Sequence, residues 1–250
     1  MNYRNLAISL ALAFVVGLAA CAPKEGALEV AVGDATSVVV TNDRGSVSII
    51  GGSVPDLIFL SHAIHSDDGD ATVADVSLVA GPSGDEFVVS VSTPGPDVWV
   101  DLVVGMPEGM RWSVTTGTGD VFLEALGGGG DVQTATGVVS GGDITGGLAV
   151  VAEFSEVHFD LRIEEGDQVS VQLGEGAIEL DLPTPTHAEL HAETDDGTLL
   201  LWELDFSGDS DSRFADGTLG NGGTAGISLY TSSGDISLIG AGEVTPEATE

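Results

Sequence analysis

The sequence is poor in cysteine and in basic residues, and each shortage excludes a class of protein. A single Cys among 250 residues allows no disulfide within the chain and no zinc site built from several cysteines. Six Lys and Arg stand against 40 Asp and Glu, which gives a formal charge of -34. Because so negative a surface repels nucleic-acid phosphates, we expect no nucleic-acid partner.

Signatures of the common enzyme classes are also missing. Lys24 is the only Lys and precedes the body of the chain, so neither a P-loop nor a Schiff-base lysine is available there. The chain has no Gly-x-Ser-x-Gly nucleophile motif either. We therefore predict a protein that is not an enzyme, with no catalytic residues and no cofactor. Divalent cations held loosely by the acidic surface are the inorganic partners that this composition favours.

The N-terminus has the pattern of an export signal. Arg4 precedes an apolar run from Leu6 to Ala20. This run is about fifteen residues long, shorter than the ~20 that a membrane-spanning helix needs. A basic start, a short apolar run and small residues behind it are typical of a secretory signal.

The apolar run ends in the tetrapeptide Leu-Ala-Ala-Cys, whose last residue is Cys21. This tetrapeptide resembles the lipobox of bacterial lipoproteins. The resemblance implies that residues 1–20 are a signal peptide, that Cys21 carries the lipid, with palmitate among its acyl groups, and that residues 21–27 form a tether. It also implies a lipid-anchored location on the cell envelope, at the outer membrane in a Gram-negative cell. An ordinary cleaved signal with an incidental Cys is the alternative.

Residues 28–240 show the pattern of an all-β domain, followed by a polar tail at 241–250. From Val157 to Glu164 every odd position is apolar and every even position is polar, so a strand there buries one face. The same alternation recurs at 169–173 and 178–182. Because no stretch shows apolar residues at helical spacing for three turns, we expect few helices.

Short turn motifs recur between these segments and predict how the strands are arranged. A Gly-Asp pair precedes a β-branched residue at Gly119, Gly130, Gly142 and Gly234. Weaker copies begin at Gly45, Gly176 and Gly197. The spacing indicates a half-period of about 10 or 11 residues and a full period of about 21. We therefore predict a parallel β-helix (β-solenoid) of short Gly-Asp-Val strands, with a β-sandwich as the alternative.

The chain also resembles a known family. The step from a strand into Met-Pro at 103–107, the Leu-Asp-Leu-Pro step at 180–183 and the successive Gly-Asp-Val strands are similar to the bacterial "putative adhesin" β-strand-repeat proteins, including the head domain of GIN type. The resemblance covers 30–239 and is strongest over 101–202. It implies a right-handed parallel β-helix, a surface location and no catalytic residues. The chain departs from the family at 205–225, where we expect a long loop.

The sharpest local candidate for a metal site is the His-rich stretch that begins at His187. In a strand, His187, Glu189, His191 and Glu193 project from one face, and imidazole and carboxylate groups are zinc ligands. However, His187 and His191 would lie about 13 Å apart along a strand at ~3.3 Å per residue, too far to share one ion unaided. A solvated polar face is the alternative. Acidic loops such as Asp195-Asp196 are a further candidate for cations, although none has EF-hand spacing.

Together these features predict a non-enzymatic, lipid-anchored β-solenoid protein of the cell envelope that serves adhesion or surface interaction. Its partners would be the membrane, through Cys21, and a surface glycan or protein. The alternative is a carbohydrate-binding or polysaccharide-cleaving β-helix that uses paired carboxylates. Trp99, Trp112 and Trp202 would suit a sugar-stacking platform if exposed, although packing against the core is the plainer interpretation.

Overall fold

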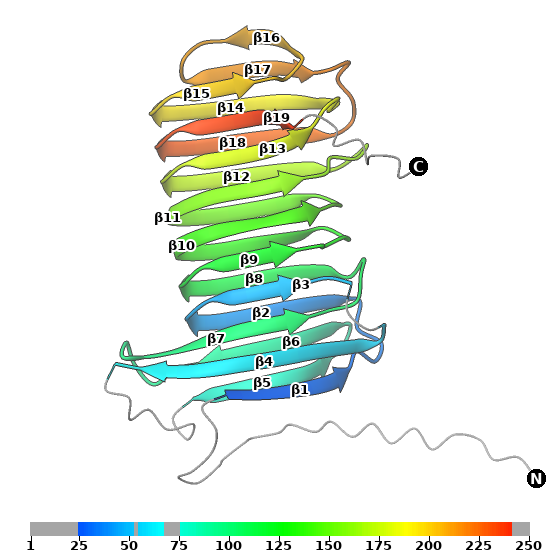
Figure 1. Ribbon diagram of the computed structural model, residues 1–250, viewed down its shortest axis with the longest axis vertical. Helices are drawn as coiled ribbons and strands as arrows, with labels where there is room; N and C mark the ends of the chain where they lie inside the picture. Colours follow the sequence, from blue (N-terminus) through cyan, green and yellow to red (C-terminus); the bar gives the residue numbers. More distant parts are fainter. Residues whose placement is uncertain (1–24, 53–54, 68–75, 242–250) are drawn as a thin grey trace, which may run out of the picture.

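The computed structural model describes residues 25–52, 55–67 and 76–241, and every regular element in these ranges is a β-strand (Figure 1). The prediction of an all-β domain is confirmed. The signal peptide, Cys21 and nearly all of the polar tail lie outside the described residues. None of the described residues belongs to a helix long and apolar enough to cross a membrane.

Nineteen strands form one open sheet that is hydrogen-bonded throughout. In chain order they are β1 (Glu25–Ala31), β2 (Ser37–Arg44), β3 (Val47–Ile50), β4 (Leu57–Ser66), β5 (Ser77–Ser83), β6 (Glu86–Ser92), β7 (Val98–Gly105), β8 (Arg111–Thr118), β9 (Val121–Glu124), β10 (Gly130–Ile144), β11 (Leu148–Leu161), β12 (Gln168–Glu175), β13 (Ile178–Pro183), β14 (Ala188–Asp196), β15 (Leu199–Trp202), β16 (Phe206–Ser210), β17 (Phe214–Leu219), β18 (Gly226–Ser233) and β19 (Ile236–Ala241).

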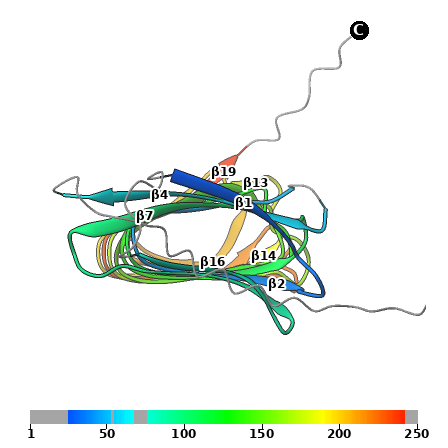
Figure 2. The same cartoon turned by 90° about the horizontal axis from the view of Figure 1, so that it is seen from below.

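The chain passes back and forth between two ladders of strands, which face each other in the end view (Figure 2). The first ladder runs β5-β6-β2-β8-β10-β11-β12-β18-β14-β17-β16. The second runs β1-β4-β7-β3-β9-β10-β11-β13-β19-β15. The long strands β10 and β11 continue around the corner and belong to both ladders. We call one strand of the first ladder with its successor in the second a rung.

Alternating side chains explain why both ladders bury one face. In β11, Val157, Phe159 and Leu161 are buried whereas His158 and Asp160 are exposed. The same pattern holds in β12 and β13, where the sequence predicted it. The inner faces of both ladders contribute to one continuous apolar core. The acidic residues are left on the outer faces and in turns, so a charge of -34 is compatible with a folded core.

The length of a rung varies along the stack. Val114, Val132 and Val150 lie side by side in β8, β10 and β11, so each of these rungs takes 18 residues. The next rung brings Val171 beside Val150 and takes 21. The predicted period of about 21 therefore describes the step from β11 to β12 and is wrong for the two rungs before it. The difference arises where the chain returns from the second ladder to the first, because that loop is longer at 162–167 than at 145–147.

The corner from the first ladder to the second is built around a column of glycines. It consists of Gly45, Gly119, Gly137, Gly176, Gly234 and Gly197, with Ser155 in the β11 position. A Cβ added to Gly119 would overlap the carbonyl oxygen of Gly45, and one added to Gly137 would overlap that of Gly119. Rungs therefore approach so closely at this corner that a side chain pointing along the stack has no room.

Two of the four strong Gly-Asp motifs do not belong to this column. Gly130 opens β10 and packs against the indole ring of Trp112, whereas Gly142 lies near the end of β10, inside a register shift. The predicted half-period of about 10 or 11 residues is wrong, because it was measured between glycines from different places in the rung. Only Gly119 and Gly234, together with the three weaker copies, mark the same corner.

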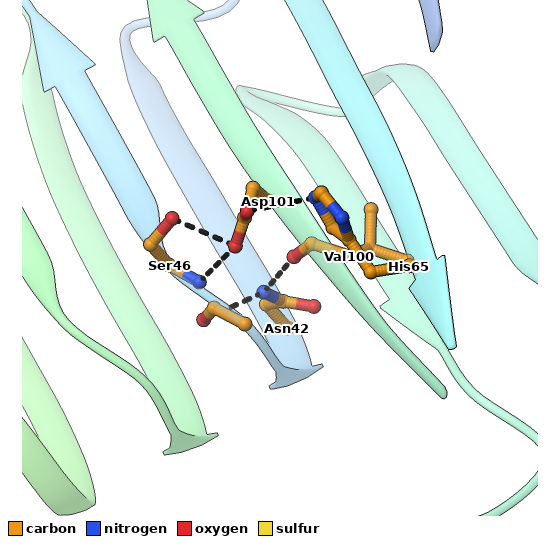
Figure 3. Close-up of polar contacts among 6 residues, drawn as sticks. Asn42, Ser46, His65, Val100 and Asp101 are labelled. Atoms are coloured by element: carbon orange, nitrogen blue, oxygen red, sulfur yellow. Dashed lines mark hydrogen bonds and ion pairs between the residues drawn. The ribbon is translucent and has the colours of Figure 1, made fainter. Parts of the chain in front are cut away.

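A second repeat lies beside the glycine column and was missed in the sequence. Three residues before the corner, most rungs have a buried Asn or Thr: Asn42, Thr116, Thr134, Thr194 and Thr231. Figure 3 shows the first of them, in which Asn42 Nδ2 donates to the carbonyl oxygens of Val100 at 2.9 Å and Gly45 at 3.1 Å. Thr194 Oγ1 likewise donates to Gly234 at 2.8 Å. The corner repeat is therefore Asn/Thr-x-x-Gly, in which most of these side chains satisfy backbone carbonyls at the turn.

Antiparallel strands cover both ends of the first ladder and one end of the second, whose other end is the parallel strand β15. β1, β4 and β5 lie at one end and β16 and β17 at the other (Figure 1). The prediction of a long loop at 205–225 is wrong, because β16 and β17 form an antiparallel pair there. The last strand, β19, is not a free edge, because it pairs with β13 on one side and β15 on the other. A stack capped in this way leaves fewer rungs open to edge-to-edge pairing.

Candidate functional site

A shallow groove lies on the outer face of the first ladder, where β11, β12 and β18 run side by side. Its volume is about 510 Å³. It is lined by Val151, Ala152, Glu153 and Phe154 of β11, by Gln172, Leu173, Gly174 and Glu175 of β12, and by Tyr230 and Ser232 of β18. The groove therefore belongs to three adjacent strands of a rigid sheet.

Two of the three strands that line the groove, β11 and β12, belong to the rungs that depart from the corner repeat, whereas the third, β18, keeps it. Where other rungs have Asn or Thr, β11 has Ala152 and β12 has Leu173, and where others have Gly at the corner, β11 has Ser155. Ser155 Oγ donates to the carbonyl of Gly137 and remains buried. Departures from a structural repeat are expected at functional sites, so this is where we place the candidate binding site.

Two aromatic side chains border the groove. Phe154 is 52% exposed, and its register neighbours on β10 and β12 are the polar residues Thr136 and Glu175. Tyr230 is on β18, which β12 separates from β11, the strand of Phe154. The hydroxyl of Tyr230 donates to Asp195 Oδ2 at 2.7 Å. That bond to a carboxylate raises the pKa of Tyr230 above its usual value. Because strands are spaced about 4.8 Å apart, β11 and β18 lie roughly 10 Å from each other.

The floor of the groove lacks a side chain at Gly174. A Cβ there would lie 2.6 Å from the carbonyl oxygen of Glu153. Ser232 Oγ, on the adjacent strand β18, donates to the carbonyl of Gly174. The close approach of β11 thus excludes any side chain at Gly174, and the hollow between Glu153 and Ser232 follows from it.

The chemistry of the groove suits a ligand with both apolar and hydroxyl-rich surfaces. Phe154, Tyr230 and Val151 offer apolar contact, whereas Glu153 and Glu175 offer acceptors for hydroxyl hydrogens. No basic residue lines the groove, so it has no positive charge for a phosphate or carboxylate ligand. A neutral, polyhydroxylated ligand fits this set of groups best.

The predicted metal ligands in β14 and just before it lie on one face as expected, but the two His side chains contact different residues. His187, Glu189 and His191 are exposed whereas Ala188 and Leu190 are buried.

His187 Nδ1 accepts a hydrogen bond from the backbone of Asn221 at 3.1 Å, and His191 Nδ1 lies 3.7 Å from Asp216 Oδ1. The ring of His191 also makes an edge contact with that of Phe214. Metal binding at this stretch therefore stays a prediction, and the two imidazoles have separate surroundings.

Among the described residues, one group brings three His and carboxylate ligands together: His158 of β11 with Glu179 and Asp181 of β13. Sequence reasoning missed it because the residues are distant in the chain. Only the register of β11 against β13 places His158 beside Glu179. The alternation of both segments predicts that these side chains face outwards, but not which strands are neighbours.

The three tryptophans do not form a common platform. Trp112 is buried, Trp99 stacks on His65 at 5.4 Å between ring centroids, and Trp202 is 56% exposed at the opposite end of the stack from Trp99. Figure 3 shows His65 reaching Asp101, which also accepts hydrogen bonds from Ser46. The aromatic side chains of the groove, Phe154 and Tyr230, were not singled out from the sequence.

A comparison with one solved structure supports the fold. A chain described as a "putative cell adhesion protein" from Clostridium sporogenes matches 88% of this chain and 100% of its own, with a TM-score of 0.54 and 14% identity. A "putative adhesin" from Bacteroides fragilis covers 87% of this chain at 10% identity, and one from Parabacteroides distasonis 86% at 6%; their own chains are covered to 98% and 96%, and their TM-scores are 0.33 and 0.31.

The TM-score of 0.54 with the Clostridium sporogenes chain shows a shared fold. The identity of 14% shows nothing about ligands. No protein-family model matches the sequence, and no curated protein matches it. The chain is thus an all-β protein whose fold is similar to that of a bacterial protein described as a "putative cell adhesion protein".

Proposed function

We propose that this protein is a non-enzymatic adhesion protein, held on the cell envelope by a lipid on Cys21, that binds a surface glycan in the groove between β11 and β18. The observation that carries the proposal is that two of the three strands lining the groove belong to the rungs that abandon the corner repeat. The fold similarity to a "putative cell adhesion protein" supports the same role.

A glycan is favoured because a sugar ring has an apolar face and a rim of hydroxyls. Phe154 or Tyr230 would pack against the apolar face, and Glu153 and Glu175 would accept hydrogen bonds from the rim. The open, shallow shape suits an extended chain of sugars rather than a small enclosed molecule. Binding without cleavage is the activity that we infer for this surface.

The winding of the chain supports a β-solenoid as the architecture behind this role. Successive rungs pair in parallel at 18 and 21 residues, and most rungs cross from one ladder to the other at the glycine column. Such a stack offers a long, flat and rigid face for contacts with a surface.

The anchor is tested by labelling cells with radioactive palmitate. The wild-type protein should take up label, whereas a Cys21→Ala variant should not, because the thiol is the acceptor. Membrane and soluble fractions are compared in the same cells. Equal labelling of the two proteins would overturn the anchor without touching the groove.

The groove is tested on a glycan array with the purified protein. A Phe154→Thr variant introduces the residue that β10 has in register, Thr136, and should weaken binding by about 5- to 30-fold, since one aromatic contact with the ligand is worth ~1–2 kcal/mol. The matched control is Phe122→Thr, which removes a 40% exposed Phe from the second ladder. Equal losses in the two variants, or no glycan bound by the wild type, would overturn the groove.

A reducing-sugar assay on any bound glycan separates binding from cleavage. Glycan binding without release of reducing ends supports an adhesion protein. Turnover that disappears in a Glu153→Gln or Glu175→Gln variant would instead establish the polysaccharide-cleaving alternative, in which paired carboxylates act as acid and base.

A further inference from the structure

The outer face of the second ladder holds a compact group of three ligand-type side chains, around the corner from the groove on the same rungs. Their candidate ligand atoms all lie within 4.8 Å of one another. His158 Nδ1 lies 3.0 Å from Glu179 Oε1, and His158 Nε2 lies 3.8 Å from Asp181 Oδ2. The imidazole is therefore held between two carboxylates. We call these three residues the His158 group.

The register of the sheet fixes this arrangement. His158 and Glu179 are direct neighbours on the parallel strands β11 and β13, and Asp181 follows two residues later on the same face as Glu179. A third carboxylate, Asp160, is the register neighbour of Asp181 and is also exposed. Because all four project from paired strands, their backbone positions are set before any ligand binds.

The surroundings leave the negative charge of the group uncompensated. The nearest Arg along the chain, Arg162, is engaged by Asp143 at 2.9 Å. The neighbouring strands contribute Ser140 from β10 and Ser237 from β19 in register with His158 and Glu179, and neither is basic. A metal ion binds the neutral form of an imidazole, so when all three groups act as ligands the two carboxylates carry two negative charges, which one divalent cation would neutralise.

The donor set selects among cations. Calcium and magnesium prefer sites made of oxygens alone, whereas imidazole nitrogen suits zinc and the later transition metals. Zinc takes about four ligands at roughly 2.0–2.2 Å from nitrogen and oxygen, so its ligands lie about 3–3.5 Å apart. Glu179 is exposed and Asp181 is half-buried, and both side chains can make this adjustment by rotating about their own bonds. The remaining coordination position would be open to water.

We propose that His158, Glu179 and Asp181 form a zinc-binding site on the outer face of the second ladder. One imidazole nitrogen and one oxygen from each carboxylate bind the ion. The site is independent of the groove, because it lies on the other ladder and shares no residue with it. It differs from the loosely held cations expected from composition in having a nitrogen ligand and a fixed place.

The experiment is a calorimetric titration of the full chain with Zn²⁺ in a large excess of Mg²⁺. Cys21 is replaced by Ser in every sample and no His tag is present, so that neither a free thiol nor a tag binds the ion. We expect one equivalent of zinc to bind to the parent protein. The variants His158→Ala, Glu179→Gln and Asp181→Asn should each weaken binding by about tenfold or more.

The matched control is His191→Ala, because His191 also faces a carboxylate, Asp216, at 3.7 Å but belongs to no three-ligand group among the described residues. It should leave the titration unchanged. Circular dichroism confirms that each variant retains its strands, as expected for exposed positions. Unchanged zinc binding in His158→Ala, or displacement of zinc by Mg²⁺, would overturn the site. Loss of binding in His191→Ala but not in His158→Ala would move it to β14.

Discussion

Rungs that keep the corner repeat and rungs that abandon it differ in what their first ladder presents to solvent. In β8, β10, β18 and β14 a buried Thr precedes the corner glycine, and the outer positions near the corner are mostly small or polar. In β11 and β12, Ala152 and Leu173 replace that Thr, and Phe154 stands exposed. Both strands line the groove, together with β18.

The difference separates a structural repeat from a candidate binding surface. The Asn/Thr-x-x-Gly corner joins rungs through buried hydrogen bonds and close backbone contact, so it is required for stacking. A rung that gives up part of it must replace the lost contacts, as Ser155 does by donating to Gly137. Substitutions in the two kinds of rung should therefore differ in their effects on stability.

The largest effect is expected at the glycine column. Gly119→Ala would place a Cβ against the carbonyl of Gly45 at φ 138°, so both strain and overlap result. We expect a loss of about 3 kcal/mol in the free energy of unfolding, measured by denaturant titration. The control is Gly166→Ala, which has a positive φ of 91° but open space around it, and should cost about 1 kcal/mol. Equal losses would mean that stacking at the corner does not restrict side chains.

The next effect distinguishes the two departures from the repeat. Leu173→Thr restores the repeat in β12 but removes a fully buried Leu, so we expect a loss of about 2–3 kcal/mol. Ala152→Thr restores it in β11, where Thr134 already occupies the neighbouring position, and should change stability by less than about 1 kcal/mol. Thermal unfolding of both variants tests this, and the reverse order would contradict it.

A smaller effect separates threonines that bond from one that does not. Thr231 is buried and its Oγ1 donates to Gly176 at 3.0 Å, so Thr231→Val should lower the free energy of unfolding by about 1–2 kcal/mol. Thr116 Oγ1 is buried without a hydrogen-bond partner among the described residues. Thr116→Val should therefore be neutral or stabilising by up to about 1 kcal/mol. A stability loss as large in Thr116→Val as in Thr231→Val would refute this role of the corner hydroxyls.

The smallest effect is expected at the end of the stack, outside the repeat. Burial beneath β1, where Gly26 packs on the ring, lowers the pKa of His62. The unfolded chain then binds the proton more readily, so the native state loses stability as pH falls below about 6.5. His62→Gln should reduce the difference in melting temperature between pH 7 and pH 5. An unchanged or larger difference would show that carboxylates alone account for the acid sensitivity.

Much of the fold could be predicted from local patterns. Alternation in segments such as Val157–Glu164 identified strands and their buried faces, and glycines such as Gly119 identified one corner. The pairing of strands could not be predicted, because it depends on contacts between distant segments. The N-terminal rung of β2 and β3 lies between β6/β7 and β8/β9, and the C-terminal rung of β18 and β19 lies between β12/β13 and β14/β15.

The candidate sites were also predictable from the sequence only in part. The sequence directed attention to His187, Glu189 and His191 because they are adjacent in the chain, yet neighbouring positions on one strand face lie about 6–7 Å apart. Residues on paired strands lie closer, about 5 Å, and this is how His158 meets Glu179. The groove arose from a missing side chain at Gly174 between two strands, which composition does not show.

By itself the sequence determined that the chain is all-β, that its acids lie outside an aliphatic core and that glycines mark a recurring turn, because these depend on the alternation and backbone freedom of nearby residues. Contacts between segments that are distant in the chain set the order of the rungs, the antiparallel strands at the ends of the stack, the groove and the His158 group. The physical reason is that register between strands places side chains within a few ångströms of one another whatever their separation in the chain.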